Sequence, residues 1–126
     1  MDHPEPEPDA PIILLVEDEF LIRMGMADEL RDQGFVVIEA AHPIEAIAAI
    51  EAGLHPHVLL TDVRMPGEID GLALAQRLQT LMPSLLVFIT SGHLSATEEA
   101  KQIKNFIAKP YDAAQLARRT KTLLEN

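Results

Sequence analysis

The sequence contains no cysteine and no tryptophan, and aromatic residues make up only 4% of its 126 residues. Without cysteine, disulfides, thiolate metal ligands and thiol nucleophiles are all excluded. The apolar runs reach only about five residues, far short of the roughly 20 that a membrane-spanning helix needs. The N-terminus lacks a basic region followed by an apolar stretch. We therefore expect no signal peptide, no membrane insertion and a reducing, cytoplasmic setting.

Positive charge is also scarce, with 10 Lys and Arg against 20 Asp and Glu and a formal net charge of −10. Such a chain repels a phosphate backbone, so we expect no direct binding to nucleic acid. Residues 1–11 are acidic and rich in proline, which predicts a disordered, mobile leader. The apolar fraction of the chain is 48%, so residues 12–126 can bury the core of a single domain.

Short apolar runs alternate with amphipathic stretches along the rest of the chain. Each run is apolar throughout, as in strands that are buried on both faces. The runs are Ile12–Val16, Phe35–Ile38, Val58–Leu60, Leu85–Ile89 and Phe106–Ala108. Helix signals fill the intervals: about Glu19 to Gln33, Pro43 to Gly53, Asp70 to the residue before Pro83, a short stretch from Ser95, and Asp112 onward.

Several of these helix signals are specific to one end of a helix. Gly34 suits a left-handed C-terminal cap, Pro43 suits a first helical position, and Asp70 suits an N-cap. Connections of this length require parallel strands with right-handed crossovers. The pattern predicts an α/β fold with a five-stranded, parallel, doubly wound sheet of flavodoxin-like topology and a shortened fourth helix.

Polar side chains come at the ends of four of the five predicted strands. They are Glu17 and Asp18 after the first, Asp62 after the third, Thr90 at the end of the fourth and Lys109 after the fifth. The second strand ends at Glu39 and offers less. Ligand sites in open parallel sheets lie at the carboxyl ends of the strands, so we expect these side chains to converge.

This combination of groups suits phosphoryl chemistry. Carboxylates held close together repel one another, and a hard divalent cation such as Mg²⁺ relieves the repulsion. A bound cation also allows an aspartate to attack phosphorus and form an acyl phosphate. Lys109 can neutralise a phosphoryl oxygen, and Thr90 can donate its hydroxyl to one.

Each residue also has an ordinary structural explanation. Glu17 and Asp18 could favour the N-terminus of the next helix, and Asp62 could cap a helix. Thr90 could be an ordinary strand residue, and Lys109 could lie in a solvated turn. The joint placement of all five at one sheet edge favours a functional site over these separate explanations.

Five motifs, in this order, resemble those of the receiver domain of bacterial response regulators over about residues 12–125. They are Val16-Glu17-Asp18-Glu19, Thr61-Asp62-Val63-Arg64-Met65-Pro66, Asp70-Gly71, Thr90-Ser91-Gly92 and Lys109-Pro110. The segment Phe88–His93 is similar to a variant class of receivers common in alphaproteobacteria, with a Phe-x-Thr-Gly-like segment.

The resemblance implies a phosphoacceptor signalling switch of a two-component phosphorelay. Asp62 would accept the phosphoryl group, and Mg²⁺ would be held by Glu17, Asp18, Asp62 and the backbone carbonyl of Arg64. The remaining roles would fall to Thr90 and Lys109 at the phosphoryl group and to Phe106 as an aromatic switch. A histidine kinase or a histidine phosphotransfer protein would be the donor.

Other functions remain open from the residues alone. An aspartyl-nucleophile phosphatase generally needs a second acid two residues after its nucleophile, where this chain has Arg64. A flavin-binding module would need a phosphate-binding loop after the first strand, where the carboxylates of Glu17 and Asp18 would instead repel the flavin phosphate. A receiver-like interaction module that never meets phosphate is a further alternative. We expect the chain not to be an enzyme. At most, it would phosphorylate itself from small donors and remove its own phosphoryl group.

Overall fold

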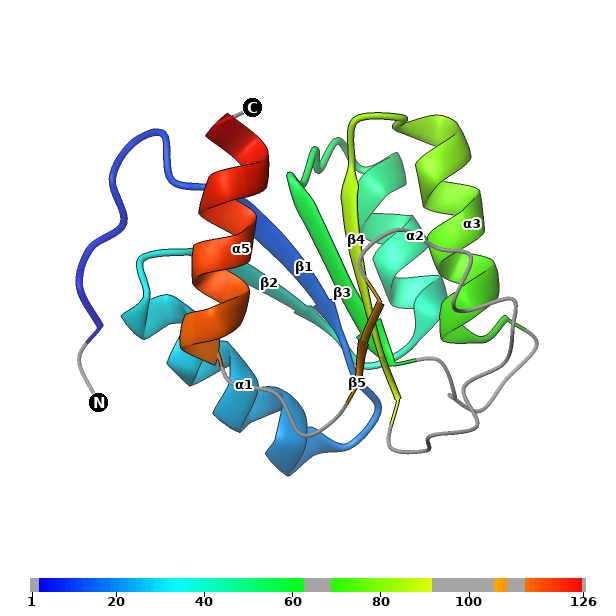
Figure 1. Cartoon of the computed structure of the whole chain (residues 1–126). Helices are drawn as coiled ribbons and strands as arrows, with labels where there is room; N and C mark the ends of the chain where they lie inside the picture. The colour runs from blue at the N-terminus through cyan, green and yellow to red at the C-terminus, as the bar shows by residue number, and fades with distance from the viewer. Residues whose placement is uncertain (1–2, 63–68, 92–105, 109–112, 126) are drawn as a thin grey trace.

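The computed structural model describes residues 3–62, 69–91, 106–108 and 113–125, which form an α/β fold around a parallel sheet (Figure 1). The strands are β1 (Ile12–Val16), β2 (Val36–Ala40), β3 (Val58–Asp62), β4 (Leu86–Ser91) and the short β5 (Phe106–Ala108). Their order across the sheet is β2-β1-β3-β4-β5, and all neighbours are parallel. The helices are α1 (Phe20–Asp32), α2 (Pro43–Glu51), α3 (Gly71–Leu81) and α5 (Ala113–Glu125). The predicted short fourth helix lies outside the described residues.

The helices cover both faces of the sheet, with α1 and α5 on one side and α2 and α3 on the other (Figure 1). Successive strand residues point to opposite faces, so β1 contributes alternately to two cores. Leu14 and Val16 pack with α2 and α3, whereas Ile13 and Leu15 pack with α1 and α5. The uninterrupted apolar run of β1 is therefore explained by burial on both faces.

Local signals end the helices where the sequence predicts. Gly34 and Gly53 follow α1 and α2 with φ of 95° and 111°, the left-handed conformation that glycine adopts at low cost. Pro43 lies in the first turn of α2. The second strand begins at Val36 instead of Phe35, because the Phe35 N–H donates to the Leu30 carbonyl at the end of α1, at 3.2 Å, and the ladder with β1 starts one residue later.

Residues 3–11 are the described part of the predicted leader, and His3 lies beside the C-terminal half of α1. His3 Nδ1 lies 2.8 Å from Asp32 Oδ1, and His3 Nε2 lies 3.2 Å from Asp28 Oδ1. Both carboxylates are well exposed, and exposed pairs contribute about 0–1 kcal/mol. The mobility of the leader therefore stays a prediction.

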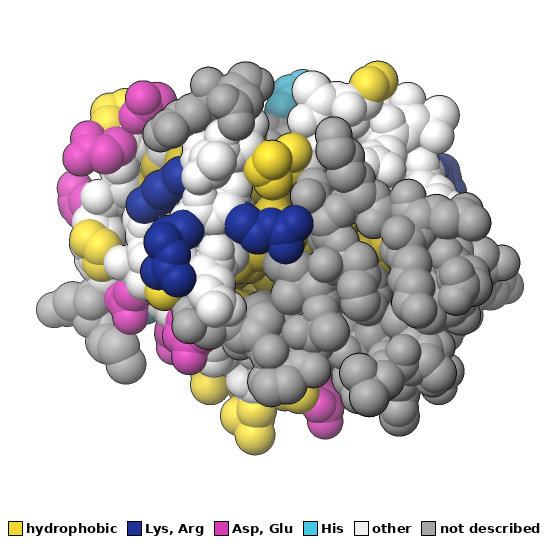
Figure 2. Space-filling model, viewed as in Figure 1, with side chains coloured by type: hydrophobic (Ala, Val, Ile, Leu, Met, Phe, Trp, Pro, Cys, Tyr) yellow, Lys and Arg dark blue, Asp and Glu magenta, His cyan; other side chains and the backbone are white. Residues whose placement is uncertain are grey.

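Charge is unevenly spread over the face of the molecule that Figure 2 shows. Acidic side chains gather at the edge where the leader runs, and basic side chains gather over α5 (Figure 2). Although the formal net charge is −10, this face therefore carries a basic region as well as acidic ones. None of the helices in the described part of the chain is long and apolar enough to cross a bilayer.

Asp70 caps α3 through a hydrogen bond of 2.8 Å from the Ala73 N–H to Asp70 Oδ1. We expect Asp70→Ala to lower the free energy of unfolding by about 1 kcal/mol, because the first turn loses an acceptor. Asp70→Asn, which keeps the side-chain oxygen, should be close to wild type. Urea denaturation of the three proteins measures both changes, and equal losses in the two variants would contradict the capping role.

Candidate phosphoacceptor site

The candidate site lies where β1, β3 and β4 end at the same edge of the sheet. The register pairs Val16 with Thr61 and Asp62 with Thr90, and Glu17 follows Val16 directly. The chain runs to β2 on one side of β1 and to β3 on the other, so this edge contains the switch point of the sheet. The expected convergence of Glu17, Asp62 and Thr90 is thus present in the structure.

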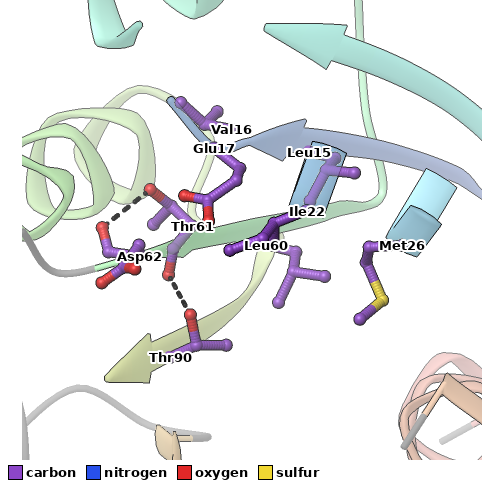
Figure 3. Close-up of a pocket in the computed structure, with 9 residues that line it drawn as sticks. All are labelled: Leu15, Val16, Glu17, Ile22, Met26, Leu60, Thr61, Asp62 and Thr90. Carbon is purple, nitrogen blue, oxygen red and sulfur yellow. Dashed lines mark hydrogen bonds between the residues drawn. The ribbon is translucent and has the colours of Figure 1, made fainter. Parts of the chain in front are cut away.

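These residues line a single pocket between the sheet edge and α1. Its lining is Leu15, Val16, Glu17, Ile22, Met26, Leu60, Thr61, Asp62 and Thr90 (Figure 3). One part of the lining carries carboxylate and hydroxyl oxygens, and another part is apolar, with Ile22 and Met26 contributed by α1. Glu17 is only 6% exposed, and Asp62 is half-buried. A polar ligand at this pocket would meet oxygens against a partly water-excluding wall.

The hydroxyls of the pocket are hydrogen-bonded to the end of β3. Thr61 Oγ1 donates to the Asp62 carbonyl at 3.1 Å, and Thr90 Oγ1 donates to the Thr61 carbonyl at 3.5 Å (Figure 3). The second distance is at the outer limit for an O–H donor, whose preferred range is about 2.5–3.0 Å. The hydroxyl of Thr90, although buried, is therefore held weakly in this arrangement.

The turn after β1 presents Glu17 to the pocket. The Glu17 N–H donates to the Ala40 carbonyl at 3.1 Å, and α1 begins three residues later. The N-cap of α1 is Glu19, and its side chain makes no capping hydrogen bond. Helix capping therefore does not explain the acidic cluster at Glu17. Asp18 is exposed beside it and does not line the pocket.

Asp62 is positioned by the start of α3 as well as by β3. The cap of α3 is Asp70, so the alternative that Asp62 is a helix cap is wrong. Gly71 approaches the end of β3 so closely that a Cβ added there would overlap the Asp62 carbonyl oxygen. The same Cβ would lie 2.9 Å from Thr61 Oγ1. The sequence marked Gly71 only as part of a motif, and this contact supplies a physical reason for it.

The side chains of three expected site residues lie outside what the structure describes. Arg64 and Lys109 lie outside the described residues, and Phe106 is described only as part of the backbone of β5. Their proposed roles stay predictions. Arg23, which sequence reasoning did not single out, donates from Nη1 to the Glu17 carbonyl at 2.9 Å. Its only signal in the sequence is a cation within an otherwise apolar stretch of the first helix.

The donor set fits magnesium. Within the part of the chain that the structure describes, no three His, Cys, Asp or Glu side chains group closely enough to hold a metal by themselves. Mg²⁺ does not require such a cage, because it keeps several waters and binds through one or two carboxylates. Glu17 and Asp62 supply two carboxylates at one pocket, and the other polar side chains of its lining are the hydroxyls of Thr61 and Thr90.

Comparison with known proteins identifies relatives over most of the chain. The family model of the response regulator receiver domain matches residues 13–121. The C4-dicarboxylate transport transcriptional regulatory protein DctD of Rhizobium meliloti is 34% identical over 85% of this chain and 24% of its own length. The sensor kinase CckA of Brucella abortus is 35% identical over 90% of this chain and 12% of its own length. This chain thus spans a quarter or less of these two curated relatives.

A solved structure gives the same picture of the fold. The response regulator receiver protein from Sinorhizobium medicae superimposes with a TM-score of 0.83 at 26% identity. The alignment covers 94% of this chain and 98% of that one. The similarity therefore extends over the whole receiver unit and is not confined to the motifs.

Proposed function

Because the chain belongs to the response regulator receiver domain family, we propose that it is a signalling switch that accepts a phosphoryl group on Asp62. The observation that carries the proposal is the convergence of Glu17, Asp62 and Thr90 on one pocket at the carboxyl edge of the sheet. A phosphoacceptor needs a nucleophilic oxygen, a cation that offsets negative charge, and a hydrogen-bond donor to the phosphoryl oxygens. In this pocket Asp62 offers the nucleophile, Glu17 and Asp62 offer ligands for a cation, and Thr90 offers the hydrogen-bond donor.

In the proposed reaction, a carboxylate oxygen of Asp62 attacks phosphorus and forms an O–P bond. The bond from phosphorus to the donor breaks, and the donor leaves with that electron pair. Mg²⁺, when bound, supplies the positive charge that offsets the negative charges of the carboxylates and the phosphoryl group. We propose that Glu17 and Asp62 hold the ion, together with Asp18 and the Arg64 carbonyl expected from the sequence.

The hydroxyl of Thr90 provides the link to switching. It now donates a long bond of 3.5 Å to the Thr61 carbonyl. A phosphoryl oxygen on the neighbouring Asp62 is an anionic acceptor, and hydrogen bonds to such acceptors are shorter and stronger. Phosphorylation would thus draw Thr90 toward Asp62 and bias β4 toward a second arrangement. Lys109 and Phe106 would complete the response, as the resemblance implies.

We propose a histidine kinase or a histidine phosphotransfer protein as the donor. The first turn of α1, next to the pocket, leaves large apolar side chains exposed, with Phe20 61% and Leu21 73% accessible. Apolar side chains exposed together mark interaction surfaces, and Ile22 of the same helical turn lines the pocket that contains Asp62. The similarity to a sensor kinase module supports the same class of partner. A cytoplasmic location and the absence of nucleic-acid binding stay predictions from the sequence.

Phosphorylation itself is the first test. The chain, incubated with Mg²⁺ and a small acyl-phosphate donor such as acetyl phosphate, should gain one phosphoryl group in its intact mass. The added group should be lost on treatment with hydroxylamine, which cleaves acyl phosphates, and should not form when EDTA is present. Peptide mapping should locate it at Asp62.

Other outcomes would point to the alternative functions. A folded protein that binds Mg²⁺ but gains no mass from either the small donor or a phosphorylated histidine phosphotransfer protein would be an interaction module. Continuous release of phosphate from a generic phosphate ester would indicate the aspartyl phosphatase. Either result would contradict the proposal.

A further inference from the structure

Arg23 joins three parts of the structure beside the pocket. Its Nη1 donates to the Glu17 carbonyl at 2.9 Å, and its Nε lies 3.5 Å from Glu39 Oε1 on β2. Its guanidinium carbon also lies 5.5 Å from the centre of the Phe20 ring, within the range of a cation–π contact. The side chain is only 14% exposed, so these contacts are partly shielded from water.

The consequence for Glu17 is that both of its backbone polar groups are fixed. Its N–H donates to the Ala40 carbonyl of β2 at 3.1 Å, and its carbonyl accepts from Arg23. Arg23 is in turn held by Glu39, one residue before Ala40. The main chain that carries the Glu17 carboxylate is therefore tied to the end of β2 directly through Ala40 and indirectly through Arg23. The planar guanidinium suits this role, because its fixed fork of donors can serve two acceptors at once.

Arg31 provides an internal comparison on the same helix. Its Nη2 lies 3.2 Å from Glu39 Oε2 and donates to a backbone carbonyl, that of Val37, at 3.0 Å. Both arginines thus connect α1 to Glu39, and each also binds one main-chain oxygen. They differ in the main-chain oxygen that they bind. Arg23 binds the carbonyl of Glu17, the candidate metal ligand, whereas Arg31 binds the carbonyl of Val37.

We propose that Arg23 is a positioning residue for the metal site and that it acts through the main chain of Glu17. It orients the Glu17 carboxylate before Mg²⁺ arrives and so raises the affinity for the ion. Partners that orient a metal ligand without touching the metal commonly contribute 10- to 100-fold in affinity. The inference rests on the proposed function of the pocket, since it assigns Glu17 to Mg²⁺.

The test compares the wild type with Arg23→Met and Arg31→Met. Both substitutions keep an apolar stem and remove one guanidinium, one contact with Glu39 and one bond to a carbonyl. In Mg²⁺ titrations followed by amide NMR shifts, Arg23→Met should raise the dissociation constant about tenfold. Arg31→Met should leave it nearly unchanged. If Arg23→Met does not fold, Arg23→Lys serves instead, because it keeps the charge without the fork and should give a smaller increase.

A second readout needs no metal. In the metal-free protein, hydrogen exchange of the Glu17 amide should be faster in Arg23→Met than in Arg31→Met at matched global stability. Equal Mg²⁺ affinities in the two variants, or equal Glu17 exchange, would overturn the positioning role. If the wild type itself bound no Mg²⁺, the proposed function would fail instead, and amide exchange would still decide whether Arg23 fixes the turn.

Discussion

Asp62→Asn is expected to take up no phosphoryl group under conditions in which the wild type acquires one. The amide lacks the nucleophilic carboxylate, and an asparagine nitrogen or oxygen forms no acyl phosphate. Asp62 is half-buried at the pocket where Glu17 is also buried, so the substitution also removes one of two negative charges. The variant should therefore fold at least as well as the wild type. Intact mass after incubation with Mg²⁺ and acetyl phosphate measures the first effect, and urea denaturation measures the second.

The matched control is Asp70→Asn, the same chemical change eight positions along the chain. Asp70 is exposed and caps α3, and asparagine is an equally good N-cap. Asp70→Asn should thus be phosphorylated to the wild-type extent. Phosphate incorporation into Asp62→Asn at the wild-type rate would move the acceptor to another carboxylate and would leave the proposed chemistry without its nucleophile.

The parallel α/β fold could be predicted because its signals are local. A strand buried on both faces must be apolar at every position, and the run Ile12–Val16 meets that condition. Helix ends are likewise local: Gly34 has the positive φ that its position predicted, and Asp70 makes the predicted cap. Strand ends then located Glu17, Asp62 and Thr90 together, since parallel strands end at one edge of the sheet.

The supports of the site could not be predicted, because they depend on contacts between elements. Glu39 was expected to offer little, yet it binds guanidiniums from two places on α1. Nothing periodic relates Glu39 to Arg23, since one lies on a strand and the other on a helix. Gly71 has the same character: its need for glycine comes from the backbone of β3, which the sequence around Gly71 does not encode.

Gly71→Ala is expected to be strongly destabilising and to impair phosphorylation as well. The added methyl group would overlap the Asp62 carbonyl oxygen and lie 2.7 Å from the Asp62 carbonyl carbon. These are main-chain atoms, so no side-chain rotation can relieve the overlap, and α3 or the end of β3 must shift. Overpacking of this kind costs about 1–3 kcal/mol or more, and we expect the upper part of that range, with a fall in Tm of about 10 °C.

Gly25→Ala separates this effect from the general consequence of replacing a helical glycine. Gly25 lies exposed in α1, and a methyl group there meets no atom within 4 Å. Alanine favours a helix by about 0.5–1 kcal/mol over glycine, so Gly25→Ala should be more stable than the wild type. The two variants should therefore move Tm in opposite directions, and only Gly71→Ala should slow phosphorylation at temperatures where both are folded. If Gly71→Ala were as stable and as readily phosphorylated as Gly25→Ala, the close approach of α3 to Asp62 would not constrain the site. A slower reaction in a variant that is still folded would instead show that Asp62 is positioned from two sides, by its own strand and by the helix that follows it.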